Sequence, residues 1–489
     1  MGYTFNQLHF LAFCQIILVR KRGYFMSEIK TSFRKTVLRI ALPVALQSML
    51  QSSFSMIDQV MVGQLGSTSI AAVEIAGKPA FIYSFVIGAV AAIAGIMVSQ
   101  YYGKKDEEAV HKSVSVNLLV TILLALVFTV ACLLWPWKIA GIYTEDASVI
   151  EDAVPYLRMI AWTYLPMGIA SILAVRIRCM DKAVYPLYAG IASALVNTGM
   201  NWLLIFGNAG MPKLGVRGAA IASVLSQVVN LMVIVVFYLT LCGGREGILP
   251  RRMSKERDAS NIFQRILWSL QLGKGGYRQY FAMLLPVVVN EFLWSVGQNV
   301  NTYIYGHIGT QGLAAMSLTG PIQGLLIGAL SGISQAAGII IGKRLGQREY
   351  EAAYKESKLL CVYGFVSSLL LSVLLIGLRN LYTEIYQVED VVKEMAAQLL
   401  LAFAVLAPIK VENMILGGGV IRSGGRTRYI MMIDMFGTWL VGVPLGLLTG
   451  LVFKLPIVWV YFILSQEELV RLLITIVMFR SRKWMETID

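Results

Sequence analysis

Charged and metal-binding side chains are scarce in this sequence. Of its 489 residues, only 14% are charged and 57% are apolar, whereas a soluble globular protein carries about 25% charged residues. There are three histidines and five cysteines, and no two cysteines have C-x-x-C spacing, so we expect neither a metal site nor a disulfide framework. Neither H-E-x-x-H nor G-x-x-x-x-G-K-[ST] occurs. We therefore expect no enzyme, no nucleotide site and no cofactor.

Long apolar runs dominate what is present. Apolar stretches of about 20 residues or more are typical of transmembrane helices. The sequence predicts an all-α membrane protein with twelve transmembrane helices, at 36–62, 70–100, 112–134, 150–176, 183–207, 216–241, 279–305, 311–342, 354–378, 392–416, 426–450 and 454–479.

The basic residues are distributed unequally between the two sides of these spans. Of the 42 lysines and arginines, four lie well inside the predicted spans (Lys78, Arg158, Lys410 and Arg471), and six lie in loops or at span ends on one side, at Lys138, Lys213, Arg217, Arg379, Lys393 and Lys454. The other 32 lie on the side that holds the N-terminus. Cytoplasmic loops are enriched in basic residues, so we expect a plasma-membrane protein with both termini in the cytoplasm. This distribution also explains the net charge of +14 without a nucleic-acid partner.

The chain contains a duplicated unit. A shift of 243 residues carries Pro43 onto Pro286 and Gly103 onto Gly346, but it carries Asp58 onto Asn301. Two copies of six spans have the same orientation in the membrane and are related by a pseudo-twofold axis along its normal, with a central cleft as the substrate site. The predicted organisation is an N-terminal segment (1–35), an N-lobe (36–241), a cytoplasmic linker (242–278), a C-lobe (279–479) and a tail (480–489).

Residues 1–25 do not resemble a secretory signal. Their apolar run is short, and the basic cluster Arg20-Lys21-Arg22 follows it instead of preceding it. We expect Met26 to be the natural start, with a helix on the membrane surface as the alternative.

Several short motifs resemble the multidrug and toxic compound extrusion (MATE) family. They occur in the expected order across about 36–485: Met56-Ile57-Asp58 before Gly63-Gln64-Leu65-Gly66, Tyr156-Leu157-Arg158, Asn197-Thr198-Gly199-Met200-Asn201-Trp202, Gly215-Val216-Arg217-Gly218, Ile421-Arg422-Ser423-Gly424-Gly425-Arg426 and Gly442-Val443-Pro444. The resemblance implies two six-helix lobes around a V-shaped cleft. It also implies export of cationic or amphipathic organic compounds, driven by inward flow of H⁺ or Na⁺.

The sequence departs from the family pattern at ionisable positions. Family members often carry an aspartate in span five where this chain has Asn201. Members similar to NorM place a glutamate deeper in span seven and an aspartate in span ten, whereas this chain has Glu291, Lys410 and Glu412. The C-lobe therefore resembles a divergent branch of the family.

Asp58 is the first candidate for the coupling site. An ionisable group within a span costs about 2.5–3.5 kcal/mol on insertion scales and usually faces the bundle interior. Asn197 and Asn201 are four residues apart and share one helix face, and the resemblance adds Ser223 as a further hydroxyl ligand. These oxygens suit Na⁺, a hard cation, and the carboxylate alone suits a proton. The alternative is an interfacial Asp58 beside asparagines that join two helices.

A second ionisable set belongs to the C-lobe. Glu291, Lys410, Glu412, Asp434, Glu467, Glu468 and Arg471 fall within the predicted spans. Charges at membrane depth pair with one another, so a structural network is one interpretation, and a second coupling site at Glu291, Lys410 and Asp434 is the other. Aromatic side chains bind flat cations through their ring faces, and we expect Phe54, Trp294, Tyr303 and Tyr305 at the cleft.

Three other classes compete with an exporter. A lipid-linked or polysaccharide flippase of the same superfamily is one, and a non-transporting membrane protein or membrane enzyme is another. A major-facilitator transporter is disfavoured because Gly103-Lys104-Lys105-Asp106 does not match that family's loop motif. The expected partners are membrane lipids and small organic compounds, with the chain acting as a monomer.

Overall fold

The computed structural model describes residues 4–65, 67–242 and 276–488, with side chains from residue 33 onward except at 67, 68 and 70. All regular secondary structure in these ranges is helical. Almost all of the predicted linker 242–278 lies outside the described residues, and so do the side chains of residues 1–25.

The N-terminal half forms one lobe. Its helices are α1 (Thr4–Gly63), α2 (Ser67–Lys104), α3 (Glu107–Leu134), α4 (Pro136–Gly141), α5 (Ala147–Ile160), η1 (Ala161–Thr163), α6 (Tyr164–Cys179), α7 (Val184–Leu204), η2 (Asn208–Gly210) and α8 (Val216–Cys242). The predicted fourth span is the α5–η1–α6 unit, which passes through one 3₁₀ turn.

The C-terminal half forms the other lobe. Its helices are α11 (Gly276–Ile308), α12 (Thr310–Gly346), α13 (Tyr350–Glu384), α14 (Asp390–Asn413), η3 (Met414–Ile421), α15 (Thr427–Met435), η4 (Phe436–Gly442), α16 (Val443–Leu447), η5 (Leu448–Val452), α17 (Ile457–Leu464) and α18 (Glu467–Arg480). Segments η3, η4 and η5 are π-helical.

Ten helices in the described part of the chain are long and apolar enough to cross a membrane. The more polar α7, which carries Asn197 and Asn201, and the α17–α18 pair complete the twelve predicted spans. The twelfth is broken at Ser465 and Gln466, so neither half reaches the length of a membrane span. The predicted twelve-helix, two-lobe fold is confirmed.

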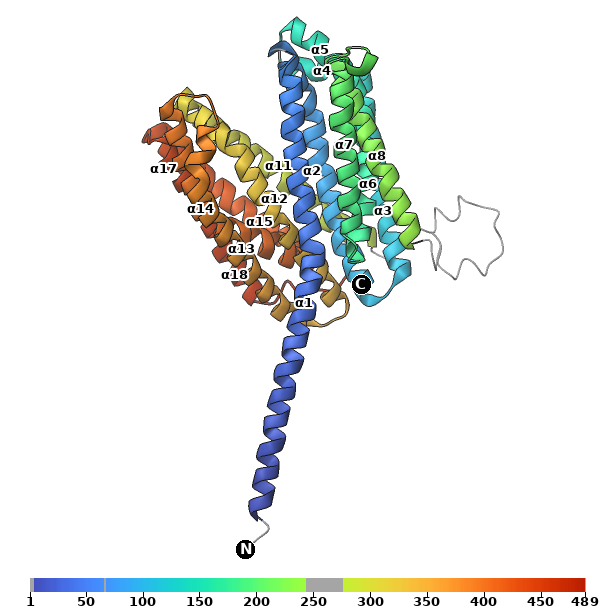
Figure 1. Cartoon of the computed structure of the whole chain (residues 1–489), viewed down its shortest axis with the longest axis vertical. Helices are drawn as coiled ribbons and strands as arrows, with labels where there is room; N and C mark the ends of the chain where they lie inside the picture. Colours follow the sequence, from blue (N-terminus) through green and yellow to red (C-terminus); the bar gives the residue numbers. More distant parts are fainter. Residues whose placement is uncertain (1–3, 66, 243–275, 489) are drawn as a thin grey trace, which may run out of the picture.

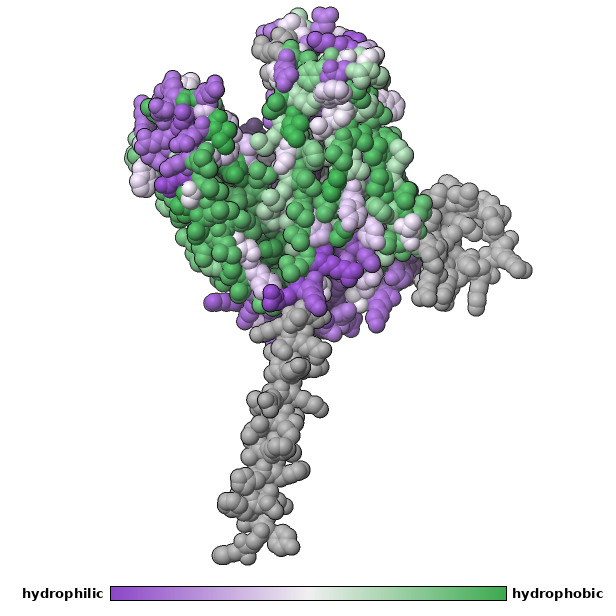
Figure 2. Space-filling view, viewed as in Figure 1, coloured by the Kyte–Doolittle hydropathy of each residue, from purple (hydrophilic) through white to green (hydrophobic). Residues whose placement is uncertain are grey.

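The two lobes form a V (Figure 1). They diverge at one end, which we call the mouth, and converge at the other, which we call the base. Figure 2 shows an apolar band across both arms, bounded by hydrophilic side chains at the mouth and the base. A protein with this pattern presents its apolar band to the lipid and its polar ends to water.

The hydrophobic cores explain this shape. One core at the base takes buried side chains from both lobes, including Ile93, Tyr280 and Ile341. Towards the mouth, each lobe has a core of its own, centred on residues such as Tyr164 in the N-lobe and Phe403 in the C-lobe. The shared core therefore joins the lobes at the base, whereas towards the mouth each lobe packs around its own core.

Polar contacts across the base reinforce this joint. Lys343 of α12 pairs with Asp181 of the N-lobe at 2.8 Å. Tyr280 of α11 donates a hydrogen bond to Asn117 of α3 at 3.2 Å. Gln100 of α2 donates through Nε2 to the Ser423 carbonyl at 2.7 Å and accepts at Oε1 from the Ile488 amide at 2.7 Å. The C-terminal tail is thus part of the joint between the lobes.

Candidate functional site

Asp58 lies within the N-lobe, beside the polar face of α7. The carboxylate accepts a hydrogen bond from Asn201 Nδ2 at 2.5 Å, and the same amide nitrogen lies 3.3 Å from Asn197 Oδ1. Asn201 is fully buried, whereas Asp58 and Asn197 are half-buried. The structure therefore brings together three of the four residues that the sequence analysis proposed for cation coupling.

One acceptor in this cluster has no partner. Asn201 Oδ1 is buried and makes no hydrogen bond to any described residue. A buried polar atom without a partner costs free energy, and a carbonyl-type oxygen beside a carboxylate is an oxygen ligand of the kind that hard cations use. The donor set fits a small monovalent cation, and the carboxylate alone fits a proton.

Two further residues differ in whether they interact with Asp58. Tyr156 of α5 is 6% exposed and interacts electrostatically with Asp58. In the sequence it stands out only as part of the motif Tyr156-Leu157-Arg158. Ser223 lies on α8, where its carbonyl accepts a hydrogen bond from Ser226 at 2.8 Å. Among the described contacts, none joins the Ser223 hydroxyl to Asp58.

A cavity of about 680 Å³ lies between the lobes. Helices α2 and α6 line it on the N-lobe side, and α11, α12, α14, η3, α15 and α18 line it on the C-lobe side. It contains all three ionisable C-lobe candidates, Glu291, Lys410 and Asp434. Asp58 does not line it, so the two ionisable sets occupy separate places.

Arg471 organises part of the cavity wall. It pairs with Asp434 and, at 3.5 Å, with Glu468. Asn290 donates to the other Asp434 oxygen at 2.8 Å, and Asn413 donates to Glu468 Oε2 at 2.8 Å. The prediction that charges at this depth pair with one another is confirmed for Asp434, Glu468 and Arg471.

The four aromatic candidates have different environments. Trp294 is 40% exposed and lines the cavity. Phe54 is half-buried outside the cavity lining. Tyr303 is 56% exposed, whereas Tyr305 is 5% exposed within the C-lobe core. Two residues of separation place side chains on opposite faces of a helix, so Tyr303 and Tyr305 cannot share one surface.

Other cavity residues were not singled out from the sequence as site candidates. Arg178, Asn290, Asn413 and the π-helical glycines Gly417 to Gly419 all line it. Arg422, also in the lining, appeared only within a motif. In the sequence, the triple glycine was the signal that could have indicated η3. In the structure, Gly419 packs against the Ser334 backbone of α12, where a side chain would not fit. π-Helical turns occur frequently at functional sites.

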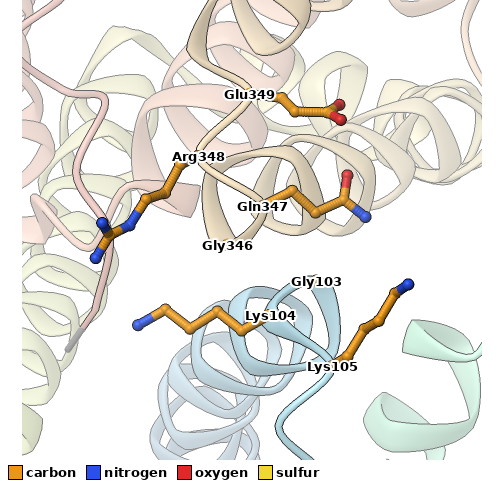
Figure 3. Close-up of a pocket in the computed structure, with 7 residues that line it drawn as sticks. All are labelled: Gly103, Lys104, Lys105, Gly346, Gln347, Arg348 and Glu349. Carbon is orange, nitrogen blue, oxygen red and sulfur yellow. The ribbon is translucent and has the colours of Figure 1, made fainter.

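A second hollow lies on the outer surface of the base, where the ends of α2 and α12 meet (Figure 3). Lys104 and Arg348 extend to the same side of it in this view. Lys104 donates to the Ile488 carbonyl, and Glu349 pairs with Arg344 at 2.6 Å. Lys104 and Glu349 are therefore engaged within the protein, and the hollow marks the joint between the repeats.

Among the described residues, no group of three or more His, Cys, Asp or Glu is placed to hold a metal ion.

Two membrane-embedded lobes around a charged and apolar cavity define a multi-pass membrane transporter. The profile of the MatE family matches residues 43–203 and 286–448, and the chain belongs to this family. The matched segments begin 243 positions apart, which is the offset of the internal repeat.

Relatives agree with this assignment. The chain is 24% identical over 457 residues to the uncharacterized transporter YisQ of Bacillus subtilis, covering 91% of this chain and 93% of YisQ. It is 26% identical over 422 residues to the probable multidrug resistance protein NorM of Bradyrhizobium diazoefficiens, covering 84% and 85%. Its fold matches a solved outward-facing conformation of a multidrug resistance MATE family transporter of the MOP superfamily, with TM-score 0.78, 17% identity and coverage of 92% and 97%.

Proposed function

We propose that the chain is a secondary active exporter that expels cationic or amphipathic organic compounds in exchange for H⁺ or Na⁺. The observation that carries this proposal is the position of the cavity. Helices of both lobes line it, so a rocking motion of one lobe against the other would change the side from which it is open. Alternating access in transporters built from repeats works in this way.

Asp58 is the coupling residue in this proposal. It accepts the hydrogen bond from Asn201 and lies beside a buried oxygen without a partner. Binding of a cation there would change the electrostatics between α1 and α7. Because α1 also packs against α12 of the other lobe, through Ala41 and Gly332, such a change has a direct route to the lobe interface.

The proposed orientation places the base in the cytoplasm of a cell whose plasma membrane holds the protein. Lys104, Lys105, Lys343, Arg344 and Arg348 gather at the base around the ends of α2 and α12. Basic residues are enriched on the cytoplasmic side. With the mouth outside, the V in Figure 1 is the outward-facing state, from which an exported compound leaves.

Everted membrane vesicles test this function. Uptake of an organic dye should require an imposed H⁺ or Na⁺ gradient and should collapse when the ionophore for that ion is added. The two gradients are varied separately, and vesicles from cells that lack the protein are the control. Uptake that depends on ATP but on neither gradient would contradict the proposal.

A further inference from the structure

The cavity between the lobes carries more positive than negative side chains. Its lining contains four cationic residues and three carboxylates: Arg178, Lys410, Arg422 and Arg471 against Glu291, Asp434 and Glu468. Arg471 is paired with Asp434 and Glu468. The other three cations face one remaining carboxylate in the lining, Glu291. Lys410 also interacts electrostatically with Glu467, which lies outside the lining.

Arg178 and Arg422 occupy structurally equivalent positions in the two repeats, although they are 244 residues apart and thus one residue out of the 243-residue register. Arg178 precedes the C-terminal residue of α6, and Arg422 follows the last residue of η3, so each lies at the inner end of the fourth span of its lobe. The backbone turns that follow them match. The Asp181 amide donates to the Arg178 carbonyl and the Gly425 amide donates to the Arg422 carbonyl, both at 3.0 Å. Asp181 and Gly425 both have positive φ angles, of 60° and 76°.

Each of these arginines has a buried donor that no described residue satisfies. The Nε atoms of Arg178 and Arg422 are both buried without a hydrogen-bond partner. Arg178 uses its terminal nitrogens, which donate to Gln335 at 3.3 Å and to Gln47 at 3.0 Å. Arg422 makes no salt bridge in the described part of the chain, and it interacts electrostatically with Glu291. Guanidinium groups bind carboxylates, sulfonates and phosphates through paired N–H donors.

A pair of aromatic rings lines the same cavity as the two arginines. Phe85 of α2 and Trp294 of α11 meet edge to face, with ring centroids 5.8 Å apart, so the pair joins the two lobes. Both rings line the cavity, together with Ile339 and Met414. A ligand that fills this space therefore meets apolar groups from both lobes and a guanidinium from each.

We propose that the cavity binds the transported compound through an anionic group held by Arg178 and Arg422, with its apolar part against Phe85 and Trp294. The substrate class is an amphipathic organic anion or zwitterion. This inference rests on the proposed export function and narrows its substrate. The structural reason is symmetry: two repeat-equivalent arginines, one in each lobe, let one anion contact both lobes at once.

Two ligands that share a naphthalene ring system and carry opposite charges test the proposal. Naphthalene-2-sulfonate and trimethyl(2-naphthyl)ammonium are titrated calorimetrically into the full-length protein in nanodiscs of phosphatidylcholine alone, which contains no anionic lipid. We expect the sulfonate to bind at least about tenfold more tightly, because a hydrogen bond to a charged group contributes the free energy of roughly a tenfold change. Raising the NaCl concentration should weaken sulfonate binding selectively.

Variants assign the binding to the two arginines. Arg422→Gln and Arg178→Gln should each weaken sulfonate binding about tenfold, whereas Arg422→Lys should retain part of the affinity. Arg379→Gln, in α13 and outside the cavity lining, is the matched control and should bind as the wild type. Thermal unfolding identifies any variant that fails to fold. Arg178→Gln removes the hydrogen-bond donor to Gln47 and Gln335. If that variant does not fold, the Arg422 variants and the salt dependence of sulfonate binding still test the proposal.

Transport measurements separate this proposal from the function on which it rests. Gradient-driven uptake of the sulfonate by everted vesicles supports both. Gradient-driven uptake of the ammonium ligand alone supports the exporter and overturns the anion site. Equal binding of both ligands, no sulfonate binding in phosphatidylcholine, or unchanged sulfonate affinity in Arg422→Gln would also overturn the anion site. Absence of gradient-driven transport for every compound, with sulfonate binding retained, would reject the export function only.

Discussion

Gly103 and Gly346, which are 243 positions apart, each lie against the helix of the other repeat. A Cβ atom added to Gly103 would overlap the Lys343 carbonyl, and one added to Gly346 would overlap the Gln100 carbonyl. Gln100 and Lys343 are themselves 243 positions apart. The two contacts are therefore pseudo-twofold copies of each other, and α2 and α12 cross at the base where neither has room for a side chain.

Gly346→Ala should destabilise the protein through this crossing. Overpacking of a tight contact costs about 1–3 kcal/mol, whereas alanine in an open helical position is favoured over glycine by about 1 kcal/mol. Gly324→Ala in the same helix, where a Cβ meets nothing within 4 Å, is the control and should be neutral or stabilising. Thermal unfolding in detergent measures both, and a Gly346→Ala protein as stable as the control would contradict the close crossing.

The Lys343–Asp181 pair should hold the base closed. Reversing one charge, in Lys343→Asp, places two carboxylates together and should favour opening by about 1 kcal/mol. Cys179, which is fully buried beside this pair, reports opening through its rate of reaction with a thiol reagent in a protein that retains only this cysteine. The charges at 343 and 181 also act on this thiol, so the compared quantity is the rate constant of the thiolate, obtained from the pH dependence of the reaction. We expect this constant to be about fivefold higher in Lys343→Asp and to be restored in the double variant Lys343→Asp/Asp181→Lys. The same rate in all three proteins would show that the pair has no such role.

Asp58→Asn should uncouple transport from the ion gradient. The amide keeps the size of the side chain and can still bond to Asn201, but it cannot carry the charge that binds a cation or a proton. We expect gradient-driven accumulation in everted vesicles to fall at least about tenfold, with substrate binding retained. Glu74→Gln is the matched control, since Glu74 is an exposed carboxylate paired with Lys78 at 2.5 Å. Full activity of Asp58→Asn would place the coupling site elsewhere.

Arg471→Leu should be strongly destabilising. Removal of one partner of a buried ion pair costs about 3–5 kcal/mol because the other charge remains uncompensated, and here Asp434 and Glu468 would both remain. The triple variant Arg471→Met/Asp434→Asn/Glu468→Gln removes all three charges and should recover most of the loss. Unfolding temperature and the yield of monodisperse protein measure the difference. A stable Arg471→Leu protein would contradict the stabilising role of this ion pair.

The twelve-helix, two-lobe architecture could be predicted from the amino-acid sequence. Apolar length predicts the spans because a bilayer core requires about 20 apolar residues to cross it, and the 243-residue repeat predicts two lobes with one orientation. Asp58, Asn197 and Asn201 could also be identified as site candidates from the sequence. A charge in a span and two amides at helical spacing are rare enough to be informative. Local deviations were not predicted: the break at Ser465 and the π-helical segments depend on packing against neighbouring helices.

Which side chains share a cavity depends on helix packing and could not be predicted from the sequence. Arg178 and Arg422 are 244 residues apart and belong to loops rich in basic residues, where sequence alone assigns them to membrane topology. Both residues line one cavity, and each has a buried Nε atom without a hydrogen-bond partner, which gives them a different interpretation. Tyr303 and Tyr305 show the converse, since one is exposed and the other lies in the core. Periodicity identifies a helix, but the face that meets lipid, core or cleft is set by how the twelve helices pack together.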